Sequence, residues 1–187
     1  MAYSDKQLIS DYLAGDEKSF TVLVKDYLKP VFSFVCRYVN NEQEAEDITQ
    51  EVFVKVWKNL KRFDPSKNFK TWIFTIAKNT ALDYFKKKKT INFSVFENEA
   101  GENLLWETLV DPKPLSDEIL MQANLTETMN MVIKHLTKKY QIVLFLYYYK
   151  NFTFKEISIT LGESVNTVKS RHRRALLLLK KILPVKL

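Results

Sequence analysis

The sequence predicts an all-α protein in which two small helical domains are joined by an acidic linker. Three observations favour this fold class. The 187 residues include only three glycines and five prolines, the residues that most often interrupt helices. Apolar residues recur at intervals of three and four over long stretches, as on the buried face of a helix. No stretch of strand length alternates apolar and polar residues between turn residues.

Two helices are expected within residues 6–39. One centres on DKQLISDYLA, and the other runs through FTVLVKDYLKPVFSFVCRYV. Asp16 stands between them and is suited to cap the second helix, because its carboxylate can accept hydrogen bonds from backbone N–H groups. Pro30 predicts a kink in the second helix, since proline lacks an N–H donor.

A third helix is expected in NNEQEAEDITQEVFVKVWKNLKRF, residues 40–63. Its apolar stripe consists of Ala45, Ile48, Val52, Val56 and Leu60. A second stripe is acidic, because Asp47 and Glu51 lie one helical turn apart beside Gln50. Such a surface could dock a basic partner.

Paired carboxylates also raise the question of a metal site. A carboxylate-bridged site in a helical bundle uses Glu-x-x-His motifs on facing helices. The only two histidines, His135 and His172, lack that spacing. We therefore expect no metal site, no cofactor and no catalytic residue.

Residues 61–89 combine aromatic and basic side chains. Asp64–Pro65 predicts a turn, and Trp72 and Ile76 with Leu82 or Phe85 predict a helix that ends in four lysines. Aromatic residues interleaved with lysines are typical of sites that bind single strands, where bases stack on rings. Core packing competes for the same rings: Phe74 and Tyr84 are expected to be structural, and Trp72 remains open between the two roles.

Charge divides the chain into three parts. Residues 1–89 hold 16 basic and 12 acidic side chains, a net charge of +4. Residues 90–118 hold 1 basic and 7 acidic side chains, a net charge of −6. Residues 119–187 hold 12 basic and 3 acidic side chains, a net charge of +9. Two basic parts around an acidic one indicate two nucleic-acid-binding domains and a linker that avoids DNA.

The stretch FKEISITLGESVNTVKSRHRRALLLL, residues 154–179, predicts a helix-turn-helix. Gly162 suits a tight turn after the first helix, and Ser164 can cap the second. The apolar stripe of the second helix consists of Val168, Ala175, Leu176 and Leu179. Its outer face can reach phosphates and base edges in a major groove. An ordinary helical hairpin with a solvated charged face is the alternative.

The single cysteine, Cys36, lies in an apolar stretch, which predicts a buried thiol and excludes an intramolecular disulfide. The first residues do not resemble a secretion signal, and no stretch approaches the length of a membrane span. These features predict a cytoplasmic protein.

Three motifs in this order, AEDITQEVFVKVW, FKTWIFTIAKNTALDYFKKK and FKEISITLGESVNTVKSRHRRA, resemble the extracytoplasmic-function (ECF) sigma factors of bacterial RNA polymerase. The resemblance covers about residues 10–89 and 118–183. It implies region 2 at residues 1–89, a linker at 90–118, and region 4 at 119–187.

The resemblance also implies three sets of binding residues. Core polymerase would contact Asp47, Ile48, Gln50 and Glu51. The −10 promoter element would contact Lys67, Asn68, Phe69, Trp72, Lys78, Asn79, Lys86 and Lys87. The −35 element would contact Asn166, Thr167, Lys169, Ser170, Arg171, Arg173 and Arg174. Arg171 could instead hold a phosphate or another helix.

Three positions depart from the family pattern. Glu163 replaces an apolar residue of the turn, and His172 replaces an aliphatic residue that faces the support helices, so a partly buried neutral histidine is expected. Thr137 replaces a helix-starting proline and is expected to cap that helix instead.

The function that follows is a non-enzymatic transcription initiation factor that binds core RNA polymerase and promoter DNA, with no small-molecule substrate. Analogy with the family implies an anti-sigma factor, which can be membrane-anchored. The net charge of −6 on the linker predicts that it follows the RNA exit path. An autonomous helix-turn-helix regulator is the alternative, but it would not need the docking helix. A helical nucleic-acid enzyme is disfavoured because the chain lacks a phosphate-binding glycine-rich loop.

Overall fold

The computed structural model describes residues 4–39, 41–93, 133 and 135–182 of the chain, and every element within them is helical. The chain divides into two compact units, one built around α1 to α4 and the other around α7 and α9. This architecture confirms the all-α fold class. No helix in the described ranges is long and apolar enough to cross a membrane.

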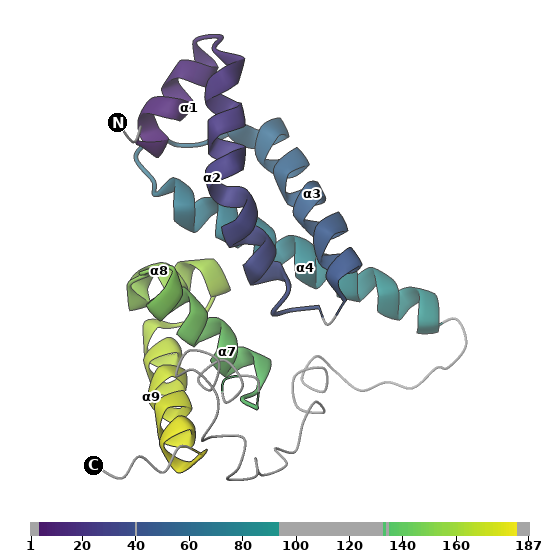
Figure 1. Cartoon of the computed structure of the whole chain (residues 1–187), viewed down its shortest axis with the longest axis vertical. Coiled ribbons are helices and arrows are strands. Elements are labelled where there is room, and N and C mark those ends of the chain that lie inside the picture. The colour runs from purple at the N-terminus through teal and green to yellow at the C-terminus, as the bar shows by residue number, and fades with distance from the viewer. Residues whose placement is uncertain (1–3, 40, 94–132, 134, 183–187) are drawn as a thin grey trace, which may run out of the picture. The chain divides into compact units, whose positions relative to one another are not determined.

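The first unit contains four α-helices and one short 3₁₀ helix (Figure 1). Their bounds are α1 Asp5–Leu13, α2 Glu17–Val35, α3 Glu42–Asn59, η1 Leu60–Arg62 and α4 Phe69–Phe93. α4 therefore continues four residues beyond the boundary that we expected at residue 89. Of the expected linker, residues 94–118 lie outside the described part of the chain.

Side-chain caps fix where the helices of this unit begin. Ser4 accepts a hydrogen bond from the Gln7 N–H before α1, and Asn41 accepts one from the Glu44 N–H before α3. Asp16 accepts one from the Lys18 N–H before α2, which confirms the predicted cap. Pro30 lies inside α2, whose helical assignment is unbroken. The kink expected at Pro30 stays a prediction.

The core of the first unit lies between α2, α3 and α4. Its largest fully buried side chains are Leu23, Phe34, Ile48, Leu60, Ile73 and Phe74. Phe34 and Phe74 meet at an angle of 64°, with 5.1 Å between their ring centroids, an arrangement that aromatic pairs prefer. Each such side chain contributes about 1.5–3 kcal/mol by its burial, so the three helices form a firm base for the surface residues.

The remaining helices within the described residues are three α-helices and a π-helical turn, which belong to the second unit except for Ile159–Leu161 at the end of α8. Their bounds are α7 Lys138–Leu144, η2 Phe145–Tyr149, α8 Phe154–Leu161 and α9 Val165–Ile182. Val143, Leu146, Ile157, Val168 and Ala175 are completely buried. The π-helix η2 was not anticipated, because the sequence FLYYY contains no proline or glycine that marks an irregular turn.

Two expectations about this unit are wrong. Thr137 precedes α7, but its side chain makes no cap hydrogen bond and its hydroxyl oxygen is buried without a partner. Leu176 was placed on the buried stripe of the last helix, yet 39% of it is exposed. Because 3.6 residues complete one helical turn, Leu176 lies on a different side of α9 from the buried residues Val168, Ala175 and Leu179.

Candidate nucleic-acid interface

The acidic stripe of α3 lies on the surface of the first unit. Asp47, Gln50 and Glu51 are exposed. The Glu51 carboxylate lies 2.9 Å from Lys55 Nζ, which also donates to Thr80 Oγ1 on α4 at 3.1 Å. Lys55 therefore links Glu51 to α4, and the stripe is an acidic patch on the surface of the unit.

Ile48 does not belong to that exposed surface. Only 1% of the residue is exposed, because its position on α3 points into the core between the helices. A partner cannot reach the Ile48 side chain, so its expected contact with polymerase needs correction. Ile48 instead anchors the helix beneath Asp47 and Glu51.

The turn before α4 is held by its own polar side chains. Asp64 Oδ1 accepts hydrogen bonds from the backbone N–H and the hydroxyl of Ser66, at 3.0 and 2.8 Å. The backbone bond from Ser66 is the main reason why the pKa of Asp64 is lowered. Asn68 Oδ1 accepts from the Thr71 N–H at 3.0 Å and caps α4. The predicted turn at Asp64–Pro65 is confirmed.

The aromatic residues of this region pack against each other. Phe69 is 4% exposed, and its ring centroid lies 5.3 Å from that of Tyr27 and 5.6 Å from those of Phe63 and Trp72. Phe69 is therefore a core residue and not an exposed stacking surface, which corrects the expectation. Trp72 is only half-buried, so part of its ring remains accessible.

The two aromatic residues expected to be structural differ in their burial. Phe74 is completely buried, as expected. Tyr84 is only half-buried, and Lys88 Nζ lies 5.9 Å from its ring centroid. Lys88 also forms an ion pair of 2.6 Å with Glu44, which links α4 to α3. Tyr84 and Lys88 therefore belong to a surface contact between two helices.

The polar residues assigned to the −10 element follow the turn and one length of α4. Lys67, Asn68, Asn79, Lys86 and Lys87 are exposed, and Lys78 is half-buried. Asn79 and Lys86 are seven residues apart, so they lie on the same side of the helix. Together with Trp72 they provide cationic and aromatic groups along one continuous element.

The second unit contains the predicted helix-turn-helix. Gly162 has a φ of +69°, the left-handed conformation that favours glycine. Ser164 Oγ accepts a hydrogen bond from the Thr167 N–H at 3.0 Å, which confirms the cap at the start of α9. The turn thus sets where α9 begins, and α9 packs against α7 through Leu144, Ala175 and Leu179, as a rigid recognition helix requires.

The outer face of α9 carries six exposed polar residues. They are Asn166, Thr167, Lys169, Ser170, Arg173 and Arg174. Thr167 also contacts the cap, since its Oγ1 lies 2.8 Å from Ser164 Oγ. This face is basic and contains no acidic residue, so it is suited to a polyanion.

Arg171 differs from its neighbours on α9. Its Nη1 lies 2.6 Å from Glu163 Oε1, and 27% of each side chain is exposed. This ion pair explains why an acidic residue is accepted in the turn. Arg171 thus links the turn to α9, and its expected contact with the −35 element stays a prediction.

His172 lies in an aromatic cluster beneath the recognition helix. Its ring centroid is 4.7 Å from that of Tyr147, 5.2 Å from Phe154 and 5.6 Å from Tyr148. Its Nε2 lies 3.2 Å from the Tyr148 hydroxyl. Burial lowers the pKa of His172, which agrees with the expected partly buried neutral histidine.

Among the described residues no group of His, Cys, Asp and Glu could hold a metal ion. Cys36 is half-buried, and burial raises the pKa of its thiol.

The sequence matches two family models, sigma-70 region 2 over residues 23–91 and sigma-70 region 4 over residues 127–179. It is 31% identical over 170 residues to the ECF RNA polymerase sigma factor SigW of Bacillus subtilis, covering 90% of this chain and 91% of that protein. The chain belongs to the ECF sigma factors.

One further relative agrees with this assignment, and one solved structure agrees with the fold. The ECF RNA polymerase sigma-E factor of Escherichia coli K12 is 28% identical over 177 residues, covering 92% of this chain and 90% of that protein. The sigma factor RpoE of Bartonella quintana, solved with the anti-sigma factor NepR, is similar in fold with a TM-score of 0.65. That match is 20% identical and covers 91% of this chain and 99% of RpoE.

Proposed function

We propose that this ECF sigma factor binds core RNA polymerase, directs it to promoters with matching −10 and −35 elements, and promotes melting of the DNA. The observation that carries this proposal is the exposed basic face of α9, fixed by a capped turn. A helix held in this way can enter a major groove with its side chains in a defined register.

Recognition of the −35 element falls to the outer face of α9. Lys169, Arg173 and Arg174 are exposed cations, and Asn166 and Ser170 are exposed polar groups. Arginine and lysine donate to the O6 and N7 acceptors of guanine, and asparagine pairs with adenine, so this set can read base edges. Arg171 supports the helix through its ion pair with Glu163.

Opening of the −10 element falls to the turn and α4. An unstacked base loses stacking energy of a few kcal/mol, which contacts with the protein must offset. Trp72 offers a partly accessible ring, while Lys67, Lys86 and Lys87 are exposed cations that can follow a single strand. Buried Phe69 contributes by holding Phe63 and Trp72 in place.

Docking on core polymerase falls to the exposed stripe of Asp47, Gln50 and Glu51. Two carboxylates at one-turn spacing suit a basic helical surface of a partner, and complementary charge favours the correct orientation. An autonomous DNA-binding regulator would have no use for such a surface. The same stripe is a target for an anti-sigma factor, which would compete with polymerase for it.

A reconstituted transcription assay tests this function. Core RNA polymerase transcribes sheared genomic DNA of the source organism with and without the purified chain, and the 5′ ends of the transcripts are mapped. We expect the chain to create discrete start sites that share two spaced upstream elements. Start sites that do not change when the chain is added would contradict the proposal.

A further inference from the structure

A pocket of about 490 Å³ in the first unit is lined by residues from α1, α2 and α3. α2 contacts both of the other helices (Figure 1). The volume falls within the range of about 300–1,000 Å³ that is usual for sites that bind small molecules. No lining residue belongs to the surfaces assigned to DNA or polymerase. The lining consists of Tyr12, Glu17, Phe20, Thr21, Phe53, Val54 and Trp57.

Aromatic rings reach this pocket from all three helices. Phe53 and Trp57 are four residues apart on α3, so they lie on the same side of that helix. The ring centroids of Tyr12 on α1 and Phe20 on α2 lie 5.2 Å apart, with the ring planes inclined at 37°. Core packing does not account for Trp57, because 53% of it is exposed, and Val54 is 48% exposed. The pocket therefore presents aromatic surface to a ligand.

One carboxylate stands among these rings. Glu17 is the only charged residue of the lining, and it shares one side of α2 with Phe20 and Thr21, which follow it by three and four residues. In the described part of the chain no cation forms an ion pair with Glu17, which is exposed. Glu17 also favours the start of α2 through the helix dipole. That role leaves its carboxylate open to a ligand.

Aromatic rings beside a single negative charge favour an organic cation. A cation over the face of Trp, Tyr or Phe is attracted by the ring electrons, most strongly where water is excluded. A primary ammonium group is strongly hydrated and has three N–H donors to satisfy. The side chains of the lining offer oxygen acceptors only at Tyr12, Glu17 and Thr21. A quaternary ammonium group has no N–H donor, and its alkyl groups suit the rings and Val54.

We propose that this pocket binds a small molecule that carries a quaternary ammonium group. The rings of Tyr12, Phe20, Phe53 and Trp57 surround the alkyl groups, and Glu17 offsets the positive charge. The volume leaves room for the chain attached to the nitrogen. Binding requires neither polymerase nor DNA, so the inference goes beyond the proposed function, and the two can fail separately.

The experiment measures the affinity of the full chain for choline, the simplest probe. NMR detects saturation transferred from the protein to the methyl groups of the ligand, so every variant is read in the same way. Two further probes are the neutral analogue of choline, in which carbon replaces the ammonium nitrogen, and methylguanidinium, which represents an arginine side chain. All titrations use one ionic strength.

The pocket variants are Trp57→Leu, which keeps an apolar side chain but removes the ring, and Glu17→Gln, which removes the charge. The matched controls are Tyr149→Leu and Glu46→Gln. Tyr149 is 50% exposed on η2, and Glu46 is exposed on α3. Neither control residue lines the pocket. Circular dichroism checks that each variant is folded.

We expect choline to bind about tenfold more tightly than its neutral analogue. Trp57→Leu and Glu17→Gln should each weaken choline binding by about threefold or more, and both controls should leave it unchanged. Equal affinity for choline and the neutral analogue would overturn the proposal, because the pocket would then be merely apolar. Tighter binding of methylguanidinium would also overturn it and would indicate an arginine side chain of a protein. So would an absence of choline binding, or equal effects of pocket and control variants.

Discussion

The ion pair between Arg171 and Glu163 joins the turn before α9 to the body of that helix. Both side chains are only 27% exposed, and Glu163 Oε2 is buried without a hydrogen-bond partner. The ion pair with Arg171 therefore offsets the negative charge of the Glu163 carboxylate. Removal of the arginine alone would leave a partly buried carboxylate unpaired.

We predict that Arg171→Ala lowers the free energy of unfolding of the full chain by about 1–3 kcal/mol. The double variant Arg171→Leu with Glu163→Leu should recover most of this loss, because no charge remains uncompensated. Urea unfolding followed by circular dichroism measures both values. Equal stability of Arg171→Ala and the wild type would show that the pair contributes nothing.

His172 makes the stability of the second unit sensitive to pH. Its pKa is lowered in the folded chain because burial disfavours the charged ring. As pH falls below about 6.5, the unfolded chain binds a proton at this histidine before the folded chain does. Stability is therefore fully present above that pH and decreases as pH falls toward the lower folded pKa.

We predict that His172→Leu removes this part of the pH dependence. As pH falls from about 7.5 to about 5.5, the free energy of unfolding of the variant should rise relative to that of the wild type. The reason is that only the wild type binds the extra proton when it unfolds. Urea midpoints at the two pH values measure the change. A constant difference between the two proteins would contradict the buried neutral histidine.

At the scale of elements, local chemistry explains which features could be predicted from sequence. The Asp16 cap, the Asp64–Pro65 turn and the Gly162–Ser164 turn depend on side chains within a few residues of each other, so sequence spacing identifies them. Phe69 is buried by Tyr27 on a helix far away along the chain. Spacing alone does not reveal such a contact, nor the π-helix η2.

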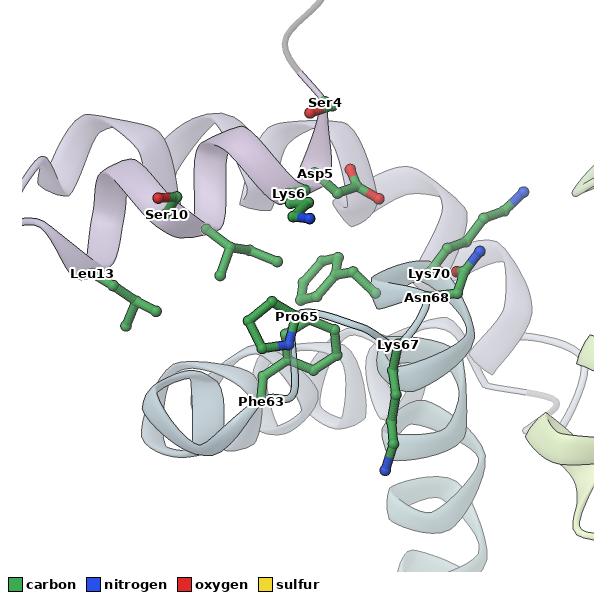
Figure 2. Close-up of a pocket in the computed structure, with 12 residues that line it drawn as sticks. Ser4, Asp5, Lys6, Ser10, Leu13, Phe63, Pro65, Lys67, Asn68 and Lys70 are labelled. Carbon is green, nitrogen blue, oxygen red and sulfur yellow. The ribbon is translucent and has the colours of Figure 1, made fainter.

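The surfaces of the molecule likewise divide into those that follow from local spacing and those that depend on tertiary contacts. The exposed face of α9 follows from helical periodicity, which places its readers opposite the buried stripe formed by Val168, Ala175 and Leu179. The pocket lined by residues of α1 and of the turn before α4 joins two elements, so it could be recognised only in the tertiary structure (Figure 2). Ile48 was included with its neighbours because of the family resemblance, although its place on the apolar stripe of the helix already indicated burial.

The α3 surface gives a prediction for the docking element. We predict that Asp47→Arg weakens binding to core polymerase by about 2 kcal/mol or more, roughly 30-fold. Asp47 is the cleaner choice than Glu51, whose replacement would also break the contact with Lys55. Fold and −35 binding should be retained.

The control for this variant is Asp26→Arg, a charge reversal of an exposed residue on α2. Affinity is measured by titration of labelled chain with core polymerase. Equal affinity of Asp47→Arg and Asp26→Arg would remove the docking assignment from α3.

At the scale of the whole molecule, charge is distributed to suit two DNA contacts. Residues 1–89 and 119–187 carry net charges of +4 and +9, and residues 90–118 carry −6. Two DNA-binding parts on one chain raise each other's effective concentration at a promoter. We propose that the acidic segment between them stays off the DNA and follows the RNA exit path.

The central claim is that the turn and α4 open promoter DNA while α9 and α3 hold the complex in place. The most direct variant combines Lys67→Ala with Asn68→Ser. Serine retains a cap for α4, which alanine would remove together with about 1 kcal/mol of stability. The change therefore acts on the DNA contacts and leaves the start of the helix intact.

The measurement is permanganate reactivity of −10 thymines in complexes of wild-type or variant holoenzyme, on duplex and on premelted promoter DNA at one salt concentration. We predict that the variant binds both templates through the −35 element but fails to open the duplex. On premelted DNA the variant holoenzyme should transcribe as well as the wild-type holoenzyme. Equal permanganate reactivity of the two proteins on duplex DNA would contradict the account.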